Sequence, residues 1–367
     1  MGKVHRHVRP AMAGALVLVP ALALTTAVPV PATAAASAKP WRVAYQHHYG
    51  AASNYSSYSA VVAPSKSDAW AFGTTNEDGS GNAAPVAVHW NGHAWRSSAL
   101  PTGLHGVIGG ASAAGPSNIW AVSALNQYAL HWNGRRWTVA HRFTGGGELT
   151  GVTALSNSDV WVFGGGGFIG GDGTWHYNGR TWTELTGAAA GIERASALSA
   201  RNIWGIGSAD SPEDSLVHYN GTSWRRLSAP ALRNAQFIGI AAISSTDVWA
   251  VGQGAGDASK APGVAVNWNG KSWRKVSVPW RYQLGAVAGD GAGGIWVTAS
   301  TFAAPDVTWV LHRSKSGAWT RVRVGAGEPA IFSLTRVPGT TAVWGAGTVA
   351  AKTAGSAAAV YAHGSVG

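Results

Sequence analysis

Residues 243–252 read I-S-S-T-D-V-W-A-V-G, and after a loop residues 266–273 read V-N-W-N-G-K-S-W. The segment from Asp247 to Gly252 is rich in β-branched and aromatic residues and follows a Ser-Ser-Thr cluster, which is typical of a strand entered through a tight turn. The pair Asn269-Gly270 between two apolar runs predicts a type I′ hairpin, in which both central residues have positive φ. With the run Phe237 to Ile243 before it, the phrase predicts four consecutive antiparallel strands.

Tryptophan recurs at the position of Trp249 along the chain, at intervals of 41 to 50 residues. This first series is Trp70, Trp120, Trp161, Trp204, Trp249, Trp296 and Trp344. The interval matches one four-stranded blade of a β-propeller. A second series, one member shorter, is Trp95, Trp137, Trp182, Trp224, Trp273 and Trp319. A single blade cannot bury two indoles by itself, so neighbouring blades must pack on one another.

The seventh unit stops before its fourth strand, and the missing Trp stands near the other end of the chain as Trp41. We predict that residues 41–45 pair with about 357–362, which would close the ring and remove two exposed sheet edges. The sequence therefore predicts an all-β fold over residues 39–367: a single seven-bladed β-propeller of four-stranded antiparallel blades, with the last blade closed by the N-terminal strand.

Four units show the repeat most clearly: residues 68–95 (D-A-W-A-F-G to H-W-N-G-H-A-W), 118–137, 159–182 and 202–224. They resemble the Trp-rich repeats of β-propeller proteins secreted by actinobacteria and are more distantly similar to Kelch and galactose-oxidase-like propellers. The resemblance covers about residues 41–364 and implies the propeller fold. It implies little about function, because propellers host many activities. A copper–radical oxidase of the galactose-oxidase kind needs a Cys, and the chain has none.

Residues 1–38 have the pattern of a secretory signal peptide: three basic residues, an apolar stretch from Ala11 to Val28, and then small residues. Cleavage is expected after Ala34 or Ala38. A membrane anchor is the weaker alternative, because Pro and Thr interrupt the apolar stretch short of the roughly 20 residues that a spanning helix needs. We expect a secreted, extracellular protein with no membrane span in the mature chain.

Removing this segment leaves 24 Lys and Arg against 16 Asp and Glu, a net charge of +8. Such an excess favours polyanionic partners, which outside a cell are acidic polysaccharides or cell-wall polymers; we expect no nucleic acid. The chain has no cysteine, which excludes disulfides, thiolate metal sites and a Cys nucleophile. We expect no cofactor.

Polar residues that repeat with the blades are predicted to be structural. The histidines at one repeat position are His89, His131, His176 and His218, with His312 nearly equivalent. Metal binding is the alternative, but equivalent residues of different blades should lie far apart, so we predict no metal at these histidines. The Asp or Asn before each first-series Trp, like the Asn-Gly pairs, is predicted to be a turn residue. Residues 210–214 could offer oxygens to Ca²⁺, although a solubilising acidic rim is the simpler interpretation.

The connections between blades do not repeat, and they should open near the propeller axis on one face, where binding residues concentrate. The candidate ligand-binding residues in these connections are Arg142, Arg194, Arg233, Trp280, Arg281, Tyr282, His105, His48 and Tyr49. Arginine can fork to a carboxylate, sulfate or phosphate while an aromatic ring stacks on a sugar. The alternative is that these residues are solvated or brace the loops.

We predict a monomeric recognition module that engages an anionic extracellular polymer, or a protein partner, through its top-face loops. The alternative is a glycan-active enzyme, a polysaccharide lyase or glycoside hydrolase, with its site in the central funnel. His47, Glu148 and Glu193 are residue types that could act as general acid or base there. No spacing shows that two such groups converge, and no hydrolase or phosphate-loop motif is present, so the catalytic residues are unknown.

Overall fold

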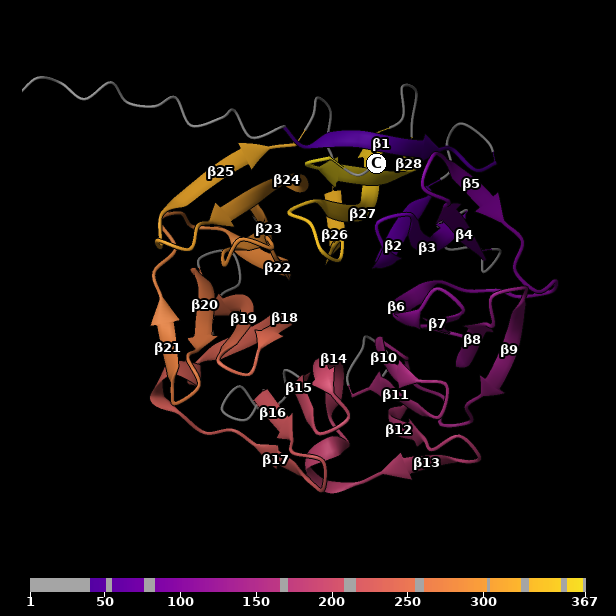
Figure 1. Ribbon diagram of the computed structural model, residues 1–367, viewed down its shortest axis with the longest axis horizontal. Coiled ribbons are helices and arrows are strands. Elements are labelled where there is room, and N and C mark those ends of the chain that lie inside the picture. Colours follow the sequence, from indigo (N-terminus) through magenta and orange to yellow (C-terminus); the bar gives the residue numbers. More distant parts are fainter. Residues whose placement is uncertain are drawn as a thin grey trace, which may run out of the picture. The chain divides into compact units, whose positions relative to one another are not determined.

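The computed structural model describes residues 40–50, 55–75, 83–165, 171–207, 216–254, 261–301, 304–324, 330–350 and 355–365. These residues form seven four-stranded antiparallel sheets, the blades of a β-propeller (Figure 1). The predicted signal peptide and the acidic segment 210–214 lie outside the described residues. Within the described ranges, no helix has the length and apolar character needed to cross a membrane.

Six blades are made of consecutive strands, with the first strand of each lining the centre. Blade 1 comprises β2 (Ser57–Ser65), β3 (Asp68–Thr75), β4 (Ala84–Trp90) and β5 (Trp95–Ser98). Blade 2 comprises β6 (Ile108–Gly115), β7 (Asn118–Ser123), β8 (Tyr128–Trp132) and β9 (Trp137–Arg142). Blade 3 comprises β10 (Gly151–Ser156), β11 (Asp159–Gly164), β12 (Gly173–Tyr177) and β13 (Trp182–Leu185).

Blade 4 comprises β14 (Ile192–Ser199), β15 (Asn202–Gly207), β16 (Leu216–Tyr219) and β17 (Trp224–Arg226). Blade 5 comprises β18 (Ala235–Ser244), β19 (Asp247–Gly254), β20 (Gly263–Trp268) and β21 (Trp273–Val276). Blade 6 comprises β22 (Gln283–Gly289), β23 (Ile295–Thr301), β24 (Ala304–Arg313) and β25 (Trp319–Arg323). Two short 3-10 turns, η1 (Gly187–Ala189) and η2 (Pro230–Leu232), follow β13 and β17.

Blade 7 joins the two ends of the propeller. It contains β26 (Ala330–Arg336), β27 (Val343–Ala350) and β28 (Ser356–His363), and its outermost strand is β1 (Arg42–His47). In Figure 1 the indigo β1 lies alongside the yellow β28, and the register runs from Arg42 opposite Ala362 to His47 opposite Ala358. Each innermost strand also contacts the next one around the ring, from β2 through β26 and back to β2. The predicted seven-bladed fold and its closure by the N-terminal strand are confirmed.

Each joint between blades is built on a first-series Trp. Trp70 of blade 1 is 1% exposed, and Trp137 of blade 2 meets it edge-on with ring centroids 5.3 Å apart. The same edge-on contact, at 5.1 to 5.9 Å, recurs in five more joints: Trp120 with Trp182, Trp161 with Trp224, Trp204 with Trp273, Trp296 with Trp41, and Trp344 with Trp95. The indoles are thus wedged between sheets, as the spacing predicts.

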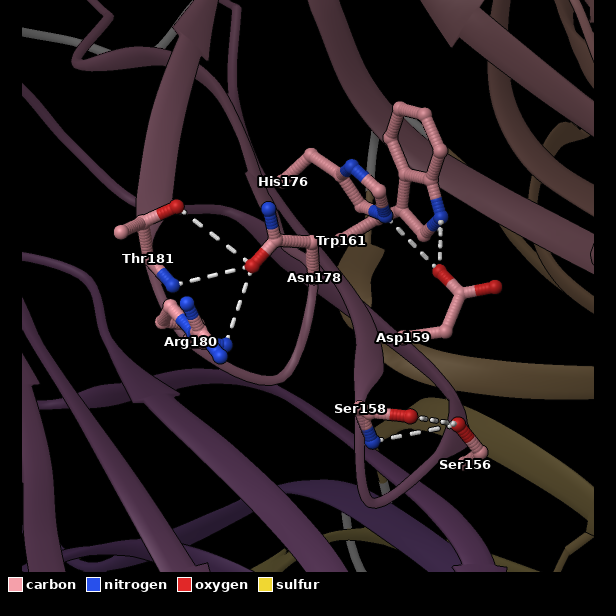
Figure 2. Close-up of polar contacts among 8 residues, drawn as sticks. All are labelled: Ser156, Ser158, Asp159, Trp161, His176, Asn178, Arg180 and Thr181. Atoms are coloured by element: carbon pink, nitrogen blue, oxygen red, sulfur yellow. Dashed lines mark hydrogen bonds and ion pairs between the residues drawn. The ribbon is translucent and has the colours of Figure 1, made fainter.

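Each repeated histidine forms a hydrogen bond with an Asp or Asn of its own blade. In blade 3, Asp159 Oδ1 accepts hydrogen bonds from Trp161 Nε1 and His176 Nε2, both at 2.9 Å (Figure 2). The His176 imidazole stacks on the Trp161 indole with centroids 4.1 Å apart. Matching His contacts join His89 to Asp68, His131 to Asn118, His218 to Asn202 and His312 to Asp290, at 2.8 to 3.0 Å. We call each such set a clip; the predicted structural role of these histidines is confirmed.

The turns differ from the prediction in two details. In the turn before β11, Ser156 Oγ, and not the predicted Asp159 side chain, accepts the backbone N–H of Ser158 (Figure 2). The Asp159 carboxylate is therefore free to bind Trp161 and His176 in the clip. At the hairpins the type I′ prediction is wrong: Gly179 has φ +90°, but Asn178 is not among the described residues with positive φ. Asn178 Oδ1 instead accepts the backbone N–H groups of Arg180 and Thr181, and this side-chain turn replaces the second positive φ.

Candidate functional site

A central channel runs between the innermost strands of the propeller. It has a volume of about 450 Å³ and is lined by the innermost strand, or the residue just before it, of all seven blades. A second cavity of about 290 Å³ adjoins it near β22 and β26. Both cavities share Arg194 and Phe332 among their lining residues. Since most other lining groups are small, apolar or backbone, these two side chains give the channel its chemical character.

Irregular strand pairing shapes the channel wall. The register between the first and second strands of a blade shifts near the start of β2, β6, β14, β18, β22 and β26. A bulge inserts an unpaired residue and re-aims the side chains beside it. In β26 the shift between Ile331 and Ser333 leaves Phe332 as the extra residue. The bulge therefore turns a large apolar ring toward the centre, where Phe332 is 50% exposed.

Arg194 stands beside the bulge of β14, at the end of the channel where the connections between blades enter. Its Nη1 donates a hydrogen bond to the carbonyl oxygen of Ile238 in blade 5, at 3.2 Å. The side chain is exposed to the channel, yet the surrounding protein desolvates the guanidinium and lowers its pKa. Arginine has five N–H donors, so most remain available to a ligand in the channel. The neighbouring Glu193 carboxylate partly offsets this lowering of the pKa, but no described carboxylate forms a salt bridge with Arg194.

Hydroxyl side chains hold the channel wall in place by linking neighbouring innermost strands. Thr150 Oγ1 donates to the carbonyl oxygen of Glu193 at 2.7 Å, from blade 3 to blade 4. Ser196 Oγ accepts the backbone N–H of Ala242 at 3.0 Å, and Ser333 Oγ accepts that of Val61 at 3.3 Å. These bonds cross from one blade to the next, so the channel is a fixed part of the scaffold.

His105 and Arg142 lie together in blade 2, joined by Tyr128. The Tyr128 hydroxyl donates to the carbonyl oxygen of His105 at 3.1 Å, and the Arg142 guanidinium lies 5.7 Å from the centre of the Tyr128 ring. Burial raises the pKa of Tyr128. Arg142 is the last residue of the outermost strand β9, and neither it nor His105 lines the channel cavities.

His48 and Tyr49 lie where β1 leads into blade 1. The Tyr49 hydroxyl is 2.9 Å from the hydroxyl of Tyr58, which is completely buried, and burial raises the pKa of both phenols. His47 packs against Tyr49 with ring centroids 4.3 Å apart. Tyr49 therefore packs the joint between blades 7 and 1, and its hydroxyl is already engaged.

Trp280 and Tyr282 form a cluster with two residues of blade 6 that the sequence analysis did not select, Trp309 and Arg321. The Arg321 guanidinium lies 5.1 Å from the Trp280 ring centre and 4.9 Å from that of Trp309. Its Nη1 donates to the Tyr282 hydroxyl at 2.7 Å. The two remaining predicted residues, Arg233 and Arg281, are exposed in the connections before β18 and β22. Of the nine predicted ligand-binding residues, Arg194 alone lines either channel cavity.

Among the described residues, none of a type suited to acid–base chemistry lines the two channel cavities. The described residues that line the two cavities include no His, Asp, Glu or Tyr. Over the described ranges, no group of three or more His, Asp and Glu side chains is placed to hold a metal ion. Asp172 is 3% exposed, and burial raises the pKa of its carboxyl. It lies in blade 3, away from the lining residues.

Phe332 is the channel residue that sequence reasoning missed. Its unit, residues 330–336, lacks a distinctive motif, and the bulge that exposes the ring has no residue type of its own. The corresponding extra residues are Ser59, Gly109, Glu193 and Ile238 in blades 1, 2, 4 and 5. A large apolar residue in a channel-facing strand is the one available signal.

No protein-family model matches the chain, and no curated protein matches its sequence. Solved propellers match its fold. YCF48 bound to a D1 peptide has a TM-score of 0.61 at 12% identity, over 89% of this chain and 97% of that one. The WD40 repeats of RRP9 have a TM-score of 0.60 at 12% identity, over 89% and 98%. The GH74 xyloglucanase from Xanthomonas campestris has a TM-score of 0.59 at 15% identity over 84% of this chain, which spans 52% of that enzyme. Likeness at these identities establishes the β-propeller fold alone.

Proposed function

We propose that this protein is a secreted recognition module that binds an anionic group of its ligand at the mouth of the central channel. The observation that carries the proposal is the position of Arg194, which lines both channel cavities and forms no salt bridge with a described carboxylate. Guanidinium binds carboxylate, sulfate and phosphate through paired N–H donors. The ligand is an acidic extracellular polymer or an acidic segment of a protein partner.

Phe332 supplies the second part of the site. A half-exposed phenyl ring in the same cavities as Arg194 offers an apolar surface to the sugar ring or side chain that carries the anion. Because the strands around both residues are linked from blade to blade, the site changes little on binding and loses little entropy. Binding is favoured over glycan cleavage because the lining residues provide no acid–base pair.

The proposal is tested with purified residues 39–367 on arrays of acidic and neutral glycans and of acidic peptides, read for both retention and chain cleavage. Retention of acidic ligands should fall about tenfold or more in Arg194→Ala, the cost of removing a charged hydrogen bond. The control is Arg96→Ala, an exposed arginine on β5. Undiminished binding by a folded Arg194→Ala protein would refute the site, and cleavage of a glycan would favour the enzyme alternative.

A further inference from the structure

A second cationic surface lies on the outermost strands of three consecutive blades. It consists of Arg225 on β17, Arg274 and Lys275 on β21, and Arg321 and Arg323 on β25. All five side chains are exposed. We call this set the basic belt; none of its members lines the channel cavities.

The belt lacks compensating charge among the described side chains. The carboxylates described between residues 216 and 324 are those of Asp247 and Asp290. Asp290 accepts a hydrogen bond from His312 in the clip of blade 6, and Asp247 accepts one from Asn267, which stands in the place of the clip histidine in blade 5. Like charges that gather on one sector repel one another, and a polyanion would relieve that repulsion.

Protection of sheet edges does not account for the belt. Lys and Arg on an edge strand discourage edge-to-edge pairing, and every blade has such an outermost strand. The outermost strands β5, β9 and β1 of blades 1, 2 and 7 carry one arginine each, Arg96, Arg142 and Arg42, and β13 of blade 3 carries Glu184. The outermost strands β17, β21 and β25 of blades 4 to 6 carry two cations each. The cations therefore concentrate on blades 4 to 6, whereas protection against edge-to-edge aggregation would be needed on every blade.

Arg321 gives the belt a fixed point. Its guanidinium lies over the indole rings of both Trp280 and Trp309 and is hydrogen-bonded to Tyr282, as described above. An exposed arginine normally loses side-chain entropy when it binds, but this one is already ordered. The partly exposed indole of Trp280 beside it can contact a sugar ring. Arg323 lies opposite Trp309 across the strand pair, which places a second cation next to this cluster.

We propose that the basic belt binds a linear acidic polysaccharide along the outer edges of blades 4, 5 and 6, with Arg321 as its anchor. Successive carboxylates or sulfates of the polymer pair with the arginines of successive blades, and its sugar rings contact Trp280. This surface is separate from the channel site, so the two proposals can fail independently.

The test uses purified residues 39–367 with polygalacturonate for carboxylate, heparin for sulfate, dextran as the neutral polymer and duplex DNA as the competing polyanion, over a series of salt concentrations. The belt variant is Arg225→Ser/Arg274→Ser/Arg321→Ser. The matched control removes three exposed arginines from blades 1 to 3: Arg96→Ser/Arg135→Ser/Arg180→Ser. Thermal unfolding verifies that both variants remain folded.

At least one acidic polysaccharide should bind, with affinity that falls steeply with salt. The belt variant should bind about tenfold or more weakly, and the slope of log affinity against log salt should become shallower by about 2, at roughly 0.7 for each cation removed. The control variant should retain the binding. Arg321→Lys, which keeps the charge but loses the planar stack, should weaken binding more than Arg274→Lys. The proposal is overturned if the control loses as much affinity as the belt variant, if DNA alone binds, or if no polyanion binds.

Discussion

The indole of Trp41 packs edge-on against that of Trp296, with ring centroids 5.6 Å apart and ring planes at 86°. Trp41 directly precedes β1, and it occupies at the joint of blades 6 and 7 the place that a second-series Trp occupies at other joints. The ring of His363, the last residue of β28, lies 4.4 Å from Trp296 and 5.5 Å from Trp41. One aromatic cluster thus fastens the first described strand to the last.

Replacing Trp41 should weaken the closure of the ring. Trp41 is 5% exposed, so Trp41→Ala should lower the free energy of unfolding by about 3–5 kcal/mol, the usual cost of removing a buried indole. Denaturation in guanidinium chloride measures this change. The control is Tyr55→Ala, since Tyr55 is 52% exposed and should contribute little. Equal midpoints for Trp41→Ala and the parent protein would contradict the role assigned to this contact.

The joint of blades 5 and 6 is built differently from the others. Where the hairpins of blades 1 to 5 carry Trp90, Trp132, Tyr177, Tyr219 and Trp268, blade 6 carries Arg313. Its guanidinium lies 5.1 Å from the centre of the Trp249 ring, where Trp132 lies 5.0 Å from Trp70. A cation–π contact therefore replaces an aromatic pair.

Arg313→Ala should destabilise the protein by about 0.5–1 kcal/mol, the range for a cation–π contact that is partly open to water. Trp132→Ala, which removes a larger apolar surface from the equivalent place, should cost more. Urea denaturation of both variants gives the comparison. A larger loss for Arg313→Ala would mean that the guanidinium has a further structural partner.

The fold could be predicted because one joint is repeated around the ring. Each first-series Trp requires a partner in the next blade, so the spacing of Trp70, Trp120 and their successors reports the number of blades directly. The second series lacks a Trp in blade 7, and this gap predicted that the blade is completed by the N-terminal strand. Trp41 takes the missing place by packing on Trp296.

The candidate site was harder to predict, because a bulge changes which side chains face the channel. Alternation along a strand assigns faces only while the pairing is regular, and the shift beside Phe332 breaks it. Arg194 could be selected because it lies next to a connection between blades. Its separation from Arg142, on the outermost strand β9, could not be read from the sequence, since both residues lie close to connections.

The stability of blade 2 should depend on pH through His131. Asn118 Oδ1 accepts hydrogen bonds from Trp120 and His131, and burial lowers the pKa of His131 below its usual value near 6.5. The folded protein then binds fewer protons than the unfolded chain as the pH falls through this range. The contribution of His131 is therefore complete above about pH 6.5 and is lost as the pH falls toward the lower, folded-state pKa.

Asn118→Asp should reduce this loss, because a carboxylate beside His131 stabilises the imidazolium. The difference in unfolding free energy between about pH 7 and about pH 5 should be smaller in Asn118→Asp than in the parent protein. Urea denaturation at the two pH values measures it, and an NMR titration of His131 should show a raised pKa. An unchanged pKa would contradict the assignment.

Close contact between the innermost strands of blades 5 and 6 requires a glycine at position 239. A Cβ atom there would overlap the carbonyl oxygen of Gly285 in β22 and lie 3.2 Å from Val251 Cγ2. Gly239→Ala must therefore push the two strands apart at the channel wall, which should cost about 1–3 kcal/mol.

Gly115 on β6 is the matched control, because a Cβ there would meet nothing within 4 Å. Its replacement by Ala should leave stability unchanged or raise it by up to about 1 kcal/mol. Thermal unfolding of the two variants measures both changes in stability. Equal changes for Gly239→Ala and Gly115→Ala would mean that the strands at position 239 can move apart at little cost. The channel wall would then be less rigid than the hydrogen bonds between blades indicate.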